Sequence, residues 1–145
     1  MNIVPYEPWH FRAFALRDYE RAFQTMLGVP DNYPQLLQGL AFTFMEEAPV
    51  GCIGVLDLWP GVGEAWLSLS TRFEIGRPSR RWAELVRLIR REFDKAMTTH
   101  HRIHTAIPLH FGPGHRFARH LGFVEEGIRR KYGPDGADYL AFVRL

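Results

Sequence analysis

Residues Gly114 to Leu145 read GHRFARHLGFVEEGIRRKYGPDGADYLAFVRL, and this stretch decides the fold. Its first part carries Phe117, Ala118 and Leu121 at helical spacing. The pattern stops at Gly122, because a glycine readily takes the left-handed conformation that ends a helix. The stretch therefore begins with a short predicted helix.

Two strands are predicted after that helix. The first runs from Phe123 to about Tyr132, and the second returns from Ala137 to Leu145. Gly133-Pro134-Asp135-Gly136 lies between them and is typical of a turn. The second strand places four alternating residues on one predicted buried face: Tyr139, Ala141, Val143 and Leu145.

The N-terminal half predicts a strand, helices and a meander. Asn2–Pro5 suits a short strand, Trp9–Leu27 has helical periodicity, and a brief helix is expected at Gln35–Gln38. Three strand-like runs follow, at Leu40–Glu46, Val50–Leu58 and Glu64–Ser70. Strands so close in sequence favour an antiparallel meander.

The longest predicted helix follows the meander. It runs from about Pro78 to Thr98, with Pro78 as its first residue, and carries an apolar stripe opposite charged faces. A strand at Ile103–Ile107 comes next. A strand that follows a crossover helix most simply lies parallel to its predecessor.

Composition predicts one cytoplasmic domain spanning residues 1–145. The 145 residues are 46% hydrophobic, enough for a single core, and show no low-complexity tract. The single cysteine, Cys52, lies in an apolar run, where we expect a buried thiol and no intramolecular disulfide. The sequence shows neither a signal peptide nor a membrane-spanning stretch.

The basic residues are unusual in kind. The formal net charge is +2, and of 18 basic residues 16 are arginine, whose planar guanidinium suits phosphate oxygens. The balancing acids argue against a nucleic-acid partner.

The C-terminal stretch HLGFVEEGIRRKYGPDGADYLAFVRL resembles the final third of the GNAT superfamily of N-acyltransferases, in which a helix ends in "LGF" and the next strand carries "EEG". The resemblance implies an α/β (α+β) fold in the order β-α-α-β-β-β-α-β-α-β-β, with helices on both faces of a mixed, mostly antiparallel sheet. It also implies that Glu64–Ser70 and Arg102–Ile107 are neighbouring parallel strands, splayed at one end, with the long helix packed across them. We expect the splay to make the cofactor slot.

The resemblance also implies acetyl-coenzyme A as co-substrate, bound by a glycine-rich loop at the start of the long helix. Unpaired N–H groups at a helix start attract phosphate. The equivalent stretch here, Ile75 to Arg81, departs from the family pattern because Pro78 and Arg80 stand at its two small positions. Either Arg77, Ser79, Arg80 and Arg81 bind the phosphates, or the segment is a solvated basic helix start.

Glu64 falls where some relatives carry the base that deprotonates the amine, and the alternative is a surface carboxylate. The resemblance further implies that backbone groups at Leu67, Leu69 and Ser70 contact the thioester. Ala118 replaces the tyrosine that protonates the leaving thiolate in many relatives.

Histidine offers a substitute acid. His110 is the candidate that we name, with His115 and His120 as alternatives, because imidazole titrates near neutral pH. Six histidines lie between His100 and His120 without the spacing of metal ligands, so we predict no metal site.

Two functions follow. The first is an acyl-coenzyme A-dependent N-acyltransferase that moves an acetyl group to a small-molecule or peptide amine by direct attack. The second is a catalytically inactive GNAT-fold binding module or virion-associated protein, because the altered loop also resembles a phage-encoded GNAT-like branch, which would act in the host cytoplasm. An exposed sheet edge near the C-terminal hairpin could pair in a homodimer.

Overall fold

A computed structural model describes residues 1–18, 20, 39–73, 75 and 77–145. The elements in chain order are β1 (Asn2–Pro5), a 3₁₀ helix η1 (Pro8–Arg12), β2 (Gly39–Met45), β3 (Pro49–Trp59), β4 (Val62–Leu69), α2 (Arg80–Ala96), β5 (Arg102–Pro108), α3 (Gly112–His120), β6 (Val124–Arg129) and β7 (Tyr139–Arg144). The described strands form one seven-stranded sheet in the order β1-β2-β3-β4-β5-β7-β6. This confirms the predicted mixed, mostly antiparallel α+β fold.

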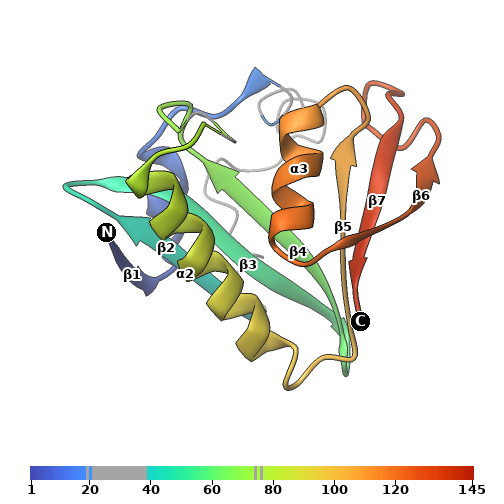
Figure 1. The fold of residues 1–145 in the computed structure, drawn as a ribbon, viewed down its shortest axis with the longest axis horizontal. Helices are drawn as coiled ribbons and strands as arrows, with labels where there is room; N and C mark the ends of the chain where they lie inside the picture. The colour runs from blue at the N-terminus through green and yellow to red at the C-terminus, as the bar shows by residue number, and fades with distance from the viewer. Residues whose placement is uncertain (19, 21–38, 74, 76) are drawn as a thin grey trace.

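The pairing of β4 with β5 is parallel and short. Its register joins Val62 to Arg102, Gly63 to Ile103 and Glu64 to His104. Figure 1 shows the two strands side by side at the end near the C-terminus and diverging toward the other end. The predicted splay between neighbouring parallel strands is therefore confirmed.

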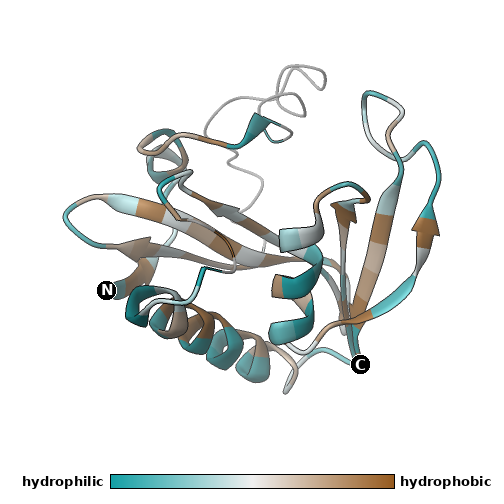
Figure 2. Ribbon diagram, turned by 45° about the horizontal axis from the view of Figure 1, so that its top comes forward, coloured by the Kyte–Doolittle hydropathy of each residue, from teal (hydrophilic) through white to brown (hydrophobic). Residues whose placement is uncertain are grey.

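The core is divided between the two faces of the sheet. On one face α2 and α3 cover the larger cluster, which includes Phe44, Ile53, Leu85 and Phe142. On the other face η1 helps to enclose a smaller cluster of buried residues, namely Tyr6, Phe11, Leu16 and Cys52. The turn between β2 and β3 is hydrophilic, whereas the middles of these strands are hydrophobic (Figure 2).

Helix α2 begins two residues later than predicted. Ser79 caps it, since its side chain accepts a hydrogen bond from the backbone N–H of Trp82 at 3.0 Å, so Pro78 lies before the helix and is not its first residue. The helix ends at Ala96, before the predicted Thr98. The predicted apolar stripe does face the sheet, with Leu85 and Ile89 fully buried.

The C-terminal unit matches the predicted order. Helix α3 is followed by Gly122 at φ +88°, the left-handed conformation expected there. The alternation predicted for the last strand is wrong, because β7 lies between β5 and β6 and is buried on both faces from Tyr139 to Val143. Leu145 follows the strand and is 80% exposed.

The N-terminal prediction of one continuous helix over Trp9–Leu27 is wrong at residues 13–17, whereas residues 18 and 20 are helical. Residues 8–12 form η1, and residues 13–17 are not helical. The rest of that segment, apart from residues 18 and 20, and the predicted helix at Gln35–Gln38 lie outside the described residues.

Two surface features bear on partners. Within the described residues, no helix is long and apolar enough to cross a membrane. Strand β6 is an exposed edge of the sheet, and its pairing with β7 is irregular between Glu125 and Gly127. Homodimer formation through this edge stays a prediction.

Candidate active site

A cavity of about 340 Å³ lies where β4 and β5 diverge. Residues of the larger core cluster line one part of it, including Phe93 of α2 and Ala118 of α3. Glu64 and Trp66 line another part, and Trp66 packs with the smaller cluster on the opposite face of the sheet. The cavity thus joins the two faces of the sheet through the gap between the strands.

Glu64 occupies the last position at which β4 pairs with β5. Its pairing partner is His104, and the side chain of Glu64 is half-buried and lines the cavity. Burial lowers the pKa of His104, although the negative charge of Glu64 opposes this shift. The buried Nδ1 atom of His104 has no hydrogen-bond partner within the described residues. A carboxylate and an imidazole therefore stand together where the gap opens.

The backbone of β4 turns alternate peptide groups toward the gap. The N–H of Ser70 donates to Val50 of β3 at 2.8 Å, whereas the carbonyl of Gly61 accepts from Arg102 at the start of β5. Because successive peptide groups of a strand point to opposite sides, the N–H groups of Leu67 and Leu69 face the β5 side. Beyond Glu64 that side is the open gap. Ser70 differs from the two leucines, since its N–H is already bonded within the sheet.

Two polar side chains, those of Arg17 and Glu20, lie beside β4. The guanidinium of Arg17 donates to the carbonyls of Leu69 at 2.6 Å and Phe73 at 2.8 Å. The carboxylate of Glu20 accepts hydrogen bonds from the hydroxyl of Ser68 and from the N–H of Arg17. Burial raises the pKa of Glu20 despite these bonds. Arg17 and Glu20 both line the cavity.

The start of α2 offers two backbone donors. Ser79 uses its hydroxyl to cap Trp82 and its carbonyl to accept from Ala83 at 3.0 Å. The N–H groups of Arg80 and Arg81, the first two residues of α2, have no partner within the helix itself. Such N–H groups at the start of a helix form a positive end that attracts phosphate.

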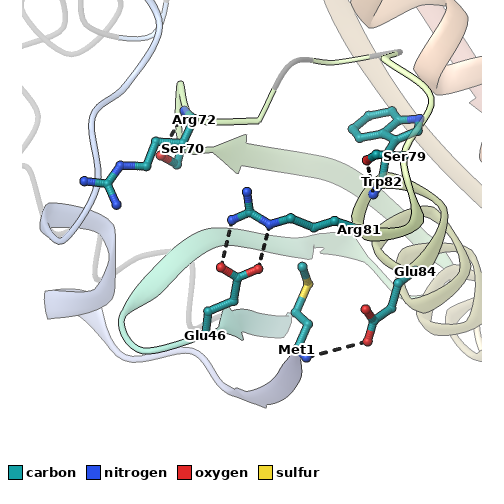
Figure 3. Close-up of polar contacts among 8 residues, drawn as sticks. All are labelled: Met1, Glu46, Ser70, Arg72, Ser79, Arg81, Trp82 and Glu84. Atoms are coloured by element: carbon teal, nitrogen blue, oxygen red, sulfur yellow. Dashed lines mark hydrogen bonds and ion pairs between the residues drawn. The ribbon is translucent and has the colours of Figure 1, made fainter.

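The side chain of Arg81 is bound to Glu46, away from the backbone N–H groups at the start of α2. Figure 3 shows it reaching from the start of α2 to Glu46, which follows β2. Two hydrogen bonds of 2.7 and 2.8 Å join their charged groups, and the guanidinium also lies 4.0 Å from the ring centre of Phe73. The side chains of Arg77 and Arg80 are exposed, the first before the helix and the second at its start.

The histidines proposed as acids lie outside the cavity lining. His110 is exposed in the turn after β5, and His120 is exposed at the end of α3. His115 is buried, and its Nε2 donates to the carbonyl of Pro108 at 2.9 Å. Ala118, at the position of the family's tyrosine, is buried and lines the cavity. The structure therefore brings Glu64, Leu67 and Leu69 together around one cavity and leaves His110 outside it.

Several cavity residues were not found by reading the sequence. Arg17 and Glu20 fell within a predicted helix, and their contacts with Leu69 and Ser68 span about fifty positions, which local patterns do not encode. Tyr132 and Tyr139 also line the cavity. Only the resemblance, which places the slot between β4 and β5, could have directed attention to these residues.

Two further observations concern the cysteine and metal binding. Cys52 is a buried free thiol whose pKa is raised by burial to about 12, so it stays protonated at neutral pH. Within the described residues, no group of three His, Cys, Asp or Glu side chains is arranged to bind a metal ion.

The sequence and the fold were compared with those of known proteins. No family model and no curated protein matches the sequence. Solved structures do match the fold. A putative phosphinothricin N-acetyltransferase has a TM-score of 0.71 at 11% identity, covering 99% of this chain and 96% of that one. A variant of spermidine N-acetyltransferase from Vibrio cholerae has a TM-score of 0.68 at 13% identity, covering 100% and 95%.

A third match is ribosomal-protein-alanine N-acetyltransferase from Brucella melitensis, with a TM-score of 0.64 at 15% identity, covering 100% of this chain and 99% of that one. The chain has the GNAT fold. Strands β4 and β5 are the splayed pair of this fold, and α2 lies between them in the chain.

Proposed function

We propose that this chain is an acyl-coenzyme A-dependent N-acyltransferase that moves an acetyl group from acetyl-coenzyme A to a primary amine. The cavity between β4 and β5 carries the proposal, because it opens onto both faces of the sheet. A thioester entering from the α2 and α3 face could therefore meet an amine entering from the other face. Holding the two reactants together lowers the entropic part of the barrier.

Glu64 is the base in this proposal. A protonated amine has no lone pair for attack, so its proton must leave before the C–N bond forms. Glu64 lines the cavity on the face opposite α2 and α3, where the amine would enter. His104, the pairing partner of Glu64 on β5, is placed to assist Glu64 in accepting the proton.

The amides of Leu67 and Leu69 are the proposed donors to the thioester carbonyl. Such donors stabilise the negative charge that develops on the oxygen during attack. Because the N–H of Ser70 is bonded to Val50, Ser70 contributes by fixing the end of β4 rather than through its N–H.

The start of α2 is the proposed site for the phosphates of coenzyme A. The N–H groups of Arg80 and Arg81 and the side chains of Arg77 and Arg80 would contact the phosphate oxygens. Ser79 shapes the site by capping the helix. The side chain of Arg81 would contribute only by leaving Glu46.

An acetyl-transfer assay tests the proposal. The purified chain is incubated with acetyl-coenzyme A and, in turn, with spermidine, phosphinothricin or a peptide with N-terminal alanine, the acceptors named for its structural matches. We expect release of the free thiol and a mass increase of one acetyl group on at least one amine. Thiol release that never exceeds the rate without protein would overturn the proposal.

One observation favours a second function, that of a GNAT-fold binding module without catalysis. Pro78 has no N–H to offer a phosphate, and the side chain of Arg80 stands where the family has a small residue. If these residues close the phosphate site, coenzyme A will not bind. The absence of binding by acetyl-coenzyme A and by free coenzyme A distinguishes this function from the enzyme.

A further inference from the structure

Two carboxylates stand on the side of the cavity opposite α2 and α3. Side chains alternate along β4, so Glu64, Trp66 and Ser68 share one face. This face lies opposite the helices, because Trp66 packs with the smaller core cluster. Glu20 reaches the same face, since its carboxylate accepts a hydrogen bond from the hydroxyl of Ser68. Glu20 and Glu64 both line the cavity, on the side from which the amine would enter.

The two carboxylates lie at different levels along β4. Glu64 is the last residue of β4 that pairs with β5, and Ser68, which binds Glu20, follows four residues later. Four residues of a strand span about 13 Å. Trp66 lies between these levels, lines the cavity and packs edge-on against Tyr6, with ring centres 5.6 Å apart. An indole ring packs against methylene groups and attracts a cation over its face.

The charge of the cavity wall favours a cationic acceptor. Among the described residues, three charged side chains line the cavity: Arg17, Glu20 and Glu64. The guanidinium of Arg17 donates to two backbone carbonyls, those of Leu69 and Phe73. The two carboxylates outnumber this one positive charge. A cationic acceptor is therefore attracted to the cavity, and an anionic one is repelled.

Glu20 has no part in the acetyl transfer proposed above, which uses Glu64 as the base. Burial raises the pKa of Glu20, although the hydrogen bonds from Ser68 and from the backbone of Arg17, and the charge of Arg17, oppose the shift. A carboxylate that is costly to bury is stabilised by a cation placed beside it. Because Glu20 is half-buried on the cavity wall, that cation can belong to a ligand.

We propose that Glu20 binds a second ammonium group of the acceptor, so that the preferred substrates of this chain are aliphatic diamines. The inference rests on the proposed acetyl transfer and names the acceptor class for it. One amino group loses its proton to Glu64 and attacks the thioester. The distal ammonium meanwhile contacts Glu20, and the methylene chain lies along Trp66.

The distal ammonium takes no part in the chemistry, so Glu20 determines specificity and is not a catalytic residue. The reacting nitrogen forms a bond to the thioester carbon, and the C–S bond breaks with its electron pair going to sulfur. The thiolate takes a proton from solvent, and Glu64 returns its proton to solvent. The products are the monoacetylated diamine and free coenzyme A.

Three acceptors of similar length test the inference. Hexamethylenediamine ends in a second ammonium group, hexylamine in a methyl group and aminocaproate in a carboxylate. We expect kcat/KM to be about tenfold higher for hexamethylenediamine than for hexylamine, because one charged hydrogen bond is gained at a half-exposed site. This exceeds the doubling that two amino groups provide. Aminocaproate should be the poorest of the three acceptors, because Glu20 repels its carboxylate.

The substitution Glu20→Gln removes the charge and keeps the size of the side chain. We expect the advantage of hexamethylenediamine over hexylamine to fall to about twofold, through a higher KM for the diamine with little change in kcat. Glu47→Gln is the matched control, since Glu47 is exposed between β2 and β3 and lies outside the cavity lining. This control should keep the ratio of the parent.

The outcomes separate the inference from the proposed function. A parent that acetylates hexylamine as well as hexamethylenediamine, or that prefers aminocaproate, would overturn the role of Glu20 and leave the enzyme intact. A Glu20→Gln variant that keeps the parent's ratio would also overturn it, because Glu20 would then be structural. If Glu20→Gln does not fold, the order of acceptors in the parent still decides. A parent that acetylates none of these acceptors and none of the three amines above would overturn both proposals.

Discussion

The two ends of the β4–β5 pair differ in how the strands use their backbone groups. At the closed end, Gly61 accepts from Arg102, and pairing continues to Glu64. At the open end, the N–H groups of Leu67 and Leu69 face a cavity instead of a strand. An unpaired N–H is costly to bury, so a gap of this kind is expected where a ligand or water completes the bonding. The contrast separates the part of the sheet that stabilises the fold from the part available for chemistry.

The largest expected effect is a loss of turnover on substitution of Glu64, which lies at the boundary between the closed and open ends. Glu64→Gln keeps the shape of the side chain and removes the base, so kcat should fall by about 100-fold or more. Binding of acetyl-coenzyme A should be nearly unchanged, because a base acts on the chemical step. Steady-state kinetics and calorimetry measure the two effects. Glu125→Gln is the matched control, since Glu125 is exposed on β6 and paired with Arg119.

Equal kcat in Glu64→Gln and parent at low pH, where less of the amine is deprotonated, would remove Glu64 from the mechanism.

A second prediction compares two isoleucines on the same face of β5. Ile103 is fully buried at the closed end, whereas Ile107 is half-buried and lines the cavity at the open end. Ile103→Ala should lower the free energy of unfolding by about 3 kcal/mol, and Ile107→Ala by about half as much, because the second site already adjoins empty space. Urea unfolding of the two variants measures both values. Equal losses would show that the gap is closed and packed in solution.

These predictions depend on residues that differ in how far the sequence could reveal them. Gly122 and the apolar stripe of α2 are local signals, and they predicted the helix ends to within a few residues. Glu64, Leu67 and Leu69 were located through the resemblance, because the order of elements places them beside the gap. Arg17, Glu20 and Tyr139 reach the cavity through tertiary contacts between distant segments, which local periodicity does not encode.

Two predictions about individual elements were wrong. The alternation predicted for β7 failed because the strand lies inside the sheet, between β5 and β6, and side chains on both of its faces are buried from Tyr139 to Val143. Pro78 was placed inside α2 because proline suits a first helical turn, but Ser79 is the N-cap and the helix begins at Arg80, two residues later than predicted.

A third prediction concerns the positive charge near the phosphate site. The double substitution Arg77→Ala and Arg80→Ala should weaken binding of coenzyme A by about 2 kcal/mol, because two exposed charged hydrogen bonds are lost. The variant should also show a weaker dependence of Kd on salt, since salt screens exposed charges. Calorimetry at low and high salt measures both effects. Arg87→Ala, also exposed on α2 but farther from the loop, should bind as the parent does.

The smallest expected effect is a pH-dependent change in the free energy of unfolding, at the closed end of the β4–β5 pair. Burial alone would lower the pKa of His100, but its bond to Asp57 at 2.6 Å, its bond to the carbonyl of Ala96 and the charge of Asp57 together raise it. A raised folded-state pKa contributes stability that is complete below about pH 6.5 and is lost as pH rises through the folded value.

Parent and Asp57→Asn should therefore differ most in free energy of unfolding at mildly acidic pH, by less than about 1 kcal/mol, and least at alkaline pH. Comparing the two proteins cancels the titration of other groups. A difference that grows with pH would contradict the role of His100.

Calorimetric titration of the chain with free coenzyme A tests the central claim most directly, namely that the gap between β4 and β5 with the start of α2 forms a coenzyme A site. We predict saturable binding of one molecule per chain that weakens as salt increases, together with a rise in Tm. The absence of heat and of any thermal shift at millimolar coenzyme A would contradict the account and leave the GNAT-fold binding module as the better description.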